Sequence, residues 1–170
     1  MDKAQAKLVM EQMTALWESE YEATCKVLEA VPDAKRDYKP DEKSRTAWEL
    51  AVHLATADVW FLESIVNHAF PWDPESEKKA LAQFANTAAV VTYYKKEWPA
   101  KLAAVRAMTG EELLQEADFF GLMKLPVVNY IGFGNNHSVH HRGQLAHGLR
   151  AMGSKVPPIY GASADFPMGS

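Results

Sequence analysis

Apolar residues recur at three- and four-residue spacing along most of this chain, as they do on amphipathic helices. The pattern predicts four long helices, at about residues 3–31, 47–69, 75–108 and 126–152. Pro99 falls inside the third of these, where we expect it to kink or split the helix. No segment alternates apolar and polar residues as a half-buried strand does, so the pattern predicts no sheet.

The segments between these helices carry residues that start and stop helices. The polar loop 32–45 leads to Thr46, which can form a capping box with Glu49 at the start of the second helix. Residues 109–112 predict a short extra helix before the last long one, and a non-helical tail begins at about residue 154. Together these elements predict an all-α fold, a four-helix bundle.

Length and composition narrow the class of protein. A chain of 170 residues suits a single domain over residues 1–170. The net charge of −4 has the wrong sign for binding to a phosphate backbone, so we expect no nucleic-acid partner. Cys25 is the one cysteine, and neither a signal peptide nor an apolar run of about 18 residues occurs. We therefore expect a cytoplasmic protein that does not associate with a membrane.

The six histidines are distributed unevenly, and four of them lie in the last predicted helix. At about 100° per residue, His137 and His141 stand one turn apart on one face, the HxxxH spacing at which two imidazoles reach one metal ion. His53 lies in the middle of the most apolar helix, which a bundle would turn toward its core. A buried imidazole needs a polar partner, and an inward-facing HxxxH pair supplies one.

Three neutral imidazoles from two helices make a donor set for Zn²⁺, Ni²⁺ or a similar divalent ion, with an open position for water or substrate. The sequence therefore predicts a metal site at His53, His137 and His141. The competing interpretation is that each is a hydrogen-bonded core residue, since a single histidine on an apolar face more often packs than binds metal. We expect the remaining histidines to be solvated, supporting or dimer-contact residues, namely His68, His140 and His147.

Two stretches of the chain resemble a known family. The run His137-Ser-Val-His-His141-Arg-Gly-Gln-Leu145, followed by Leu149-Arg-Ala-Met-Gly-Ser-Lys-Val-Pro157, resembles the last-helix signature of the DinB/YfiT superfamily. The run Ser44-Arg-Thr-Ala-Trp48-Glu-Leu-Ala-Val-His53-Leu-Ala is similar to that family's second helix. The resemblance implies an up-down-down-up four-helix bundle in which the residues matching His53, His137 and His141 bind a divalent metal. Relatives often place an aromatic residue where this chain has Gly148, so we expect a wider pocket here.

The resemblance also implies a range of activities, because members include S-transferases and isomerases that use low-molecular-weight thiols such as bacillithiol or mycothiol. Our leading hypothesis is a metal-dependent thiol S-transferase that acts on a small electrophile, with the thiol as cosubstrate. One alternative is a metal-dependent hydrolase, which would need Tyr130, Asp58 or Glu63 beside the metal as acid or base. Another is a non-catalytic stress or small-molecule-binding protein that carries a metal.

The surroundings of the site are predicted more coarsely. We expect the aromatic residues Trp48, Trp60 and Phe133 to pack the core rather than contact a substrate. Residues 32–45 and 110–125 are candidate lids. Because small bundles with apolar faces often pair, we also expect a homodimer.

Overall fold

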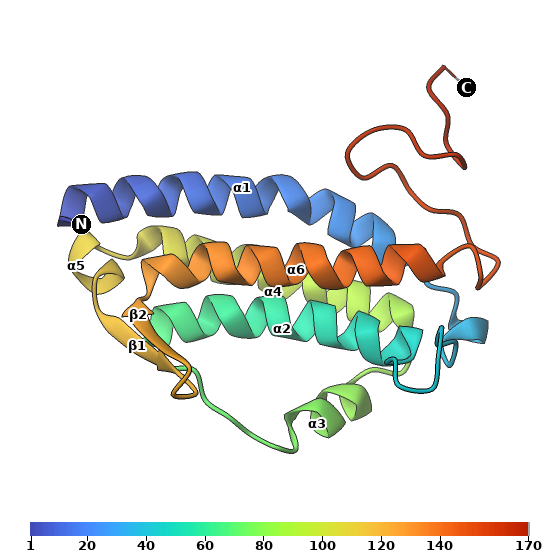
Figure 1. Ribbon diagram of the computed structural model, residues 1–170, viewed down its shortest axis with the longest axis horizontal. Coiled ribbons are helices and arrows are strands. Elements are labelled where there is room, and N and C mark those ends of the chain that lie inside the picture. The colour runs from blue at the N-terminus through green and yellow to red at the C-terminus, as the bar shows by residue number, and fades with distance from the viewer. Residues whose placement is uncertain (170) are drawn as a thin grey trace.

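Four long helices form the body of the molecule in a computed structural model that describes residues 1–169 (Figure 1). They are α1 (Lys3–Glu29), α2 (Ala47–Asn67), α4 (Thr87–Ala107) and α6 (Val128–Gly148). Helices α1 and α6 run in one direction and α2 and α4 in the other. Each of α1 and α2 packs against both α4 and α6. The predicted up-down-down-up four-helix bundle is confirmed.

Three of the four long helices, α1, α2 and α4, begin where the sequence provides a side-chain cap. Thr46 and Glu49 form the predicted capping box on α2, in which the Thr46 Oγ1 accepts the Glu49 N–H at 3.1 Å and the Glu49 carboxylate accepts the Thr46 N–H at 2.7 Å. Asp2 and Gln5 form an equivalent box on α1. These reciprocal bonds satisfy N–H groups that have no partner inside a helix.

The third predicted helix is divided, but not at the expected residue. It consists of a short α3 (Ser76–Gln83) and the long α4, separated at Phe84, whose backbone is extended. Asn86 then caps α4 by accepting the Ala89 N–H at 2.9 Å. Pro99 lies within α4, which continues through it. The expected split at Pro99 was wrong; this residue is exposed, so the backbone bond that it cannot make faces water instead of the core.

A small antiparallel hairpin precedes the last helix, and the prediction of no sheet was wrong here. Strands β1 (Glu116–Phe119) and β2 (Met123–Pro126) pair so that Phe119 lies opposite Met123. Each strand has only four residues, too few to establish an alternating pattern in the sequence. The short extra helix is confirmed as α5 (Gly110–Leu113), which carries its own Thr109–Glu112 capping box.

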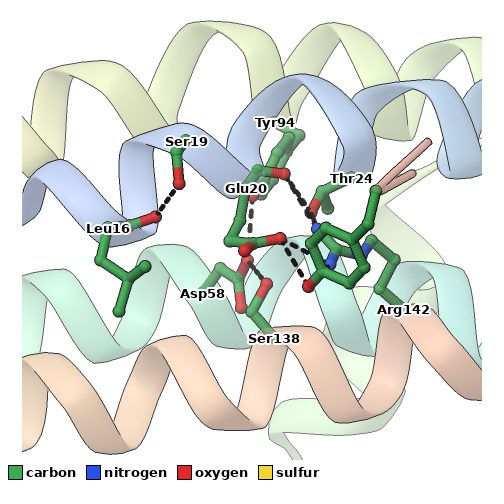
Figure 2. A network of polar contacts seen from close by, with 9 residues as sticks. Leu16, Ser19, Glu20, Thr24, Asp58, Tyr94, Ser138 and Arg142 are labelled. Atoms are coloured by element: carbon green, nitrogen blue, oxygen red, sulfur yellow. Dashed lines mark hydrogen bonds and ion pairs between the residues drawn. The ribbon is translucent and has the colours of Figure 1, made fainter. Parts of the chain in front are cut away.

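Aromatic side chains fill the centre of the bundle, and one polar cluster is buried among them. Arg142 of α6, which is 1% exposed, forms an ion pair with Glu20 of α1 at 2.6 Å (Figure 2). Arg142 also donates to the Tyr160 hydroxyl at 2.6 Å, and that hydroxyl donates to Glu20 at 2.9 Å. Tyr160 belongs to the non-helical tail, so this cluster fastens the tail to the bundle.

A 3₁₀ turn, η1 (Asp33–Lys35), lies in the loop after α1.

Candidate metal centre

The three predicted ligands lie together between α2 and α6. His53 projects from α2, while His137 and His141 project from successive turns of α6. The Nε2 atoms of His53 and His137 are 3.3 Å apart, and one nitrogen from each of the three rings lies within 4.8 Å of the other two. Among residues 1–169 this is the only group of three or more His, Cys, Asp or Glu side chains spaced to hold a metal ion.

The environment keeps these imidazoles neutral. Burial, together with the nearby Arg45 guanidinium, lowers the pKa of His53 from 6.5 to about 3. Burial and the neighbouring His141 lower the pKa of His137 to about 4, and burial also lowers the pKa of His141. A neutral ring offers a free lone pair, which is the form that a metal ion requires.

Hydrogen bonding sets the tautomer of one ring at the site and leaves a nitrogen of another ring without a partner. The Nδ1 of His141 pairs with the Oε1 of Gln144 at 2.8 Å, and because that oxygen only accepts, Nδ1 carries the proton and Nε2 carries the lone pair. The buried Nδ1 of His137 has no hydrogen-bond partner within residues 1–169. Buried polar atoms are rarely left in this state. Three converging neutral nitrogen donors therefore fit a borderline divalent ion.

A cavity of about 480 Å³ reaches His53 and His137 from the side of the bundle. Its walls come from α2, α6, the tip of the hairpin, and α3 with the segment that leads into it. Six aromatic side chains line it, namely Trp60, Phe61, Trp72, Phe119, Phe120 and Phe133. Trp60 packs against the core, as expected, and also lines this cavity, whereas Phe133 lines the cavity and is 39% exposed. Trp48 does not line it and instead lies under the Arg36 guanidinium at 5.1 Å.

Helical spacing carried a signal for two of these residues. Trp60 is seven residues after His53, and Phe133 is four residues before His137, so each shares a face with a predicted ligand. Of the two candidate lids, the segment 110–125 contributes Phe119 and Phe120, and the segment 32–45 contributes nothing to the large cavity. The part played by residues 71–73, which lie before α3, has no comparable periodic signal.

The candidate acids and bases for hydrolysis lie elsewhere. Tyr130 is fully buried and its hydroxyl donates to the carbonyls of Ala117 and Met123, at 2.9 and 3.2 Å, which fixes the hairpin. Asp58 is buried in the bundle core, and Glu63 forms an exposed ion pair with Lys101. None of these three residues is among the side chains that line the cavity.

The remaining histidines and Gly148 also lie outside the group of three. His68 ends α2 with a left-handed backbone, φ 53°, and its Nε2 pairs with the carbonyl of Glu112 at 2.9 Å. His140 and His147 are exposed. Gly148 was expected to widen the pocket beside the histidines, but it does not. It lies beside the ring of Tyr38 at a separate, much smaller cavity.

The bundle and its inward-facing histidines define a class of helical protein with a candidate metal site between its second and last long helices. The chain matches the DinB family over residues 1–167 and belongs to that family. It is similar to the protein YrdA of Bacillus subtilis, with 26% identity over 157 residues that cover 88% of this chain and 86% of YrdA.

Solved structures support the same assignment. A DinB-like protein of Bacillus cereus is 25% identical, with a TM-score of 0.73, and the DinB-like protein YjoA of Bacillus subtilis is 25% identical, with a TM-score of 0.68. Each match covers 88% of this chain and 97% of the other. A mycothiol-dependent maleylpyruvate isomerase shares the fold at 14% identity and a TM-score of 0.65, over 93% of this chain and 64% of the isomerase. Within residues 1–169, no helix is long and apolar enough to cross a membrane.

Proposed function

We propose that this protein is a metal-dependent thiol S-transferase that joins a low-molecular-weight thiol to a small electrophile. The observation that carries the proposal is the convergence of three neutral imidazoles, from His53, His137 and His141, two of which, His53 and His137, line a cavity large enough for a substrate. These residues would hold Zn²⁺ or Ni²⁺, whose affinity for nitrogen and sulfur ligands suits both the site and a thiol. A dication bound there would lower the pKa of a thiol toward neutrality.

The residues of the chain would divide the remaining work. The three histidines hold their ligand without adding positive charge, because they are neutral. The cavity walls hold the electrophile beside the thiol and exclude water, which brings the reacting atoms together. In the reaction the thiol gives its proton to solvent and its sulfur forms a bond to the electrophilic carbon. The leaving group departs with the electron pair of the bond that breaks.

Two observations favour thiol transfer over hydrolysis. The residues expected to supply the acid or base of a hydrolase lie away from the cavity, and the carboxylates that do line it, Glu49, Asp73 and Glu77, are held in hydrogen bonds or ion pairs. The mycothiol-dependent isomerase shows that the same fold accommodates a thiol-dependent reaction. That likeness supports thiol use here as a proposal about this chain.

The test combines metal content with thiol dependence. Elemental analysis of purified, untagged protein should find about one divalent ion per chain, and both His53→Ala and His141→Ala should lose it. His140→Ala is the matched control, because this exposed histidine lies next to His141 on the same helix and should leave the metal content unchanged.

Activity is then measured with 1-chloro-2,4-dinitrobenzene and a panel of thiols that includes bacillithiol and mycothiol. Thiol-dependent release of chloride by the metal-loaded protein, and none by His53→Ala, supports the proposal. If the wild-type protein binds no metal even after incubation with the ion, the proposed metal-dependent function is refuted. Turnover of ester substrates without thiol would instead indicate a hydrolase, and metal binding without any turnover would indicate a binding protein.

A further inference from the structure

One wall of the cavity is built from aromatic rings that lie against one another. Trp60 of α2 lies almost parallel to Phe120 of the hairpin turn, with ring centroids 6.2 Å apart and an interplanar angle of 10°. Trp72, in the segment before α3, meets the edge of Phe120 at 5.7 Å. Three separate parts of the chain thus converge to present aromatic faces at one place, although Trp72 is 74% and Phe120 is 40% exposed.

The charged groups around this cavity are acidic and already paired. Glu49, Asp73 and Glu77 are its only ionisable lining residues other than the histidines, within the part of the chain that the structure describes. Glu49 accepts from the capping residue Thr46, and Asp73 and Glu77 form ion pairs with Lys79 and Arg45. Because these groups already have partners, neither a free cationic side chain nor a free carboxylate lines the cavity within residues 1–169, and a charged ligand buried there would have no ionic partner.

The backbone of Phe120 is held in a conformation that a bulky residue rarely adopts. Phe120 and Gly121 are the central residues of the hairpin turn, with φ of 57° and 71°, and the Leu122 N–H closes the turn on the Phe119 carbonyl at 3.0 Å. A turn of this kind ordinarily has Asn, Asp or Gly at its first central position. Phe120 thus carries backbone strain that Asn would relieve, and strained residues of this type cluster at ligand sites.

We propose that the electrophile is an uncharged aromatic molecule of one or two rings, held in the cavity against Trp60 and Phe120. The inference deepens the proposed function and rests on it for the role of this molecule as a substrate. The cavity volume of about 480 Å³ lies within the range of small-molecule sites, about 300–1,000 Å³. An apolar aromatic wall binds such a ring by burial and stacking, and the lack of a free ionic partner among the described lining residues disfavours a charged one.

Three probes with the same two rings test the charge preference. They are naphthalen-2-ylmethanol, which is neutral, 2-naphthoate, which is anionic, and naphthalen-2-ylmethylamine, which is cationic at pH 7. Binding is measured by calorimetry on purified wild-type protein, before and after dialysis against a chelator. The chelated sample isolates the cavity, because no metal is then available to bind a carboxylate. The neutral probe should bind about tenfold more tightly than either charged probe, and equal or tighter binding of a charged probe, or no binding at all, would overturn the proposal.

A pair of variants in one turn tests the role of Phe120. Phe120→Asn should bind the neutral probe about tenfold more weakly while its Tm stays equal to or above that of the wild type, because Asn tolerates the left-handed backbone. Leu122→Asn is the control, since Leu122 lies in the same turn, is 79% exposed and does not line the cavity. Unchanged affinity in Phe120→Asn would overturn the assignment.

The two proposals fail separately. If the neutral probe binds but the protein cannot be loaded with metal, the aromatic ligand site is supported and the proposed transferase function is refuted. Metal-dependent thiol transfer by a protein that prefers a charged probe, or binds none, would remove only the substrate class.

Discussion

The carboxylate of Asp58 accepts a hydrogen bond of 2.7 Å from the hydroxyl of Ser138, the residue that directly follows His137 on α6 (Figure 2). The same carboxylate oxygen accepts from the Tyr94 hydroxyl at 2.9 Å, so one acidic group links α2, α4 and α6. The other oxygen has no partner within residues 1–169. Burial raises the pKa of Asp58 from 3.8 to about 7, against the lowering effect of these hydrogen bonds. The core therefore contains an acid that folding favours in its protonated form.

This raised pKa predicts that Asp58 makes the folded state lose stability as the pH rises. The native state binds more protons at this site than the unfolded state between about pH 4 and pH 7, so the free energy of unfolding falls with pH in that window. Asp58→Asn, which keeps an acceptor oxygen, should remove the fall and gain on the order of 2–4 kcal/mol relative to wild type between pH 5 and pH 8. Urea denaturation at both pH values measures this difference.

The matched control for Asp58→Asn is Glu63→Gln, an exposed carboxylate on the same helix. Its pH profile should run parallel to that of the wild type. If the profile of Asp58→Asn also runs parallel to the wild type, Asp58 is ionised in the native state and the assignment of its proton is incorrect.

The buried ion pair between Arg142 and Glu20 should be sensitive to the loss of either partner alone. Arg142→Leu leaves a carboxylate in the core without its cation and should cost about 3–5 kcal/mol. The double variant Glu20→Leu/Arg142→Leu should cost less than the sum of the two single variants, because it leaves no unpaired charge. Chemical denaturation of the four proteins gives the coupling energy directly.

An exposed ion pair on α1, the helix of Glu20, provides the comparison for Arg142. Lys26 and Glu22 of α1 lie 2.7 Å apart, with side chains that are 45% and 78% exposed. Lys26→Leu should change stability by less than about 1 kcal/mol. A similar cost for Lys26→Leu and Arg142→Leu would contradict the argument that burial sets the difference.

Two glycines of α6 should respond in opposite ways to the same substitution. A Cβ at Gly134 would lie 2.5 Å from the Trp17 ring, which is fully buried and packed edge-on against Trp98. Gly134→Ala should therefore destabilise the protein by about 1–3 kcal/mol. Gly143→Ala meets nothing within 4 Å and should stabilise it by up to about 1 kcal/mol, because Ala has the higher helix propensity. Thermal unfolding distinguishes the two signs, and stabilisation by both substitutions would show that α1 and α6 can move apart.

Much of the bundle was predictable because its determinants are local. A few neighbouring residues are enough to predict the Thr46–Glu49 capping box and the apolar face of α2, and both are present in the structure. The hairpin was missed because contacts from another element hold it. The Tyr130 hydroxyl of α6 donates hydrogen bonds to two of its carbonyl groups. Pro99 misled the prediction for a related reason. Its effect depends on whether it faces solvent or core, which the helical pattern alone does not determine.

The candidate site shows the same division. Helical spacing placed His137 and His141 on one face, and the apolar surroundings of His53 turned it inward, so the three rings were brought together as the pattern indicated. The cavity also depends on residues 71–73, which belong to an irregular connection before α3 that no periodicity describes. Asp58 shares a helix with His53, yet its position five residues further on turns it toward Tyr94 and away from the cavity.

Gln144 should tune metal affinity through His141. Its Oε1 pairs with the Nδ1 of His141 at 2.8 Å, which fixes the proton on Nδ1 and leaves the lone pair of Nε2 free for a metal. Gln144→Ala should weaken metal binding by about 10–100-fold without changing the stoichiometry, and Gln144→Glu, which retains an acceptor oxygen, should restore it. Asn136→Ala is the control, because Asn136 is exposed on the same helix next to His137. Affinities are measured by competition with a chromophoric chelator. Wild-type affinity in Gln144→Ala would show that the orientation of His141 is set by packing instead of by this hydrogen bond.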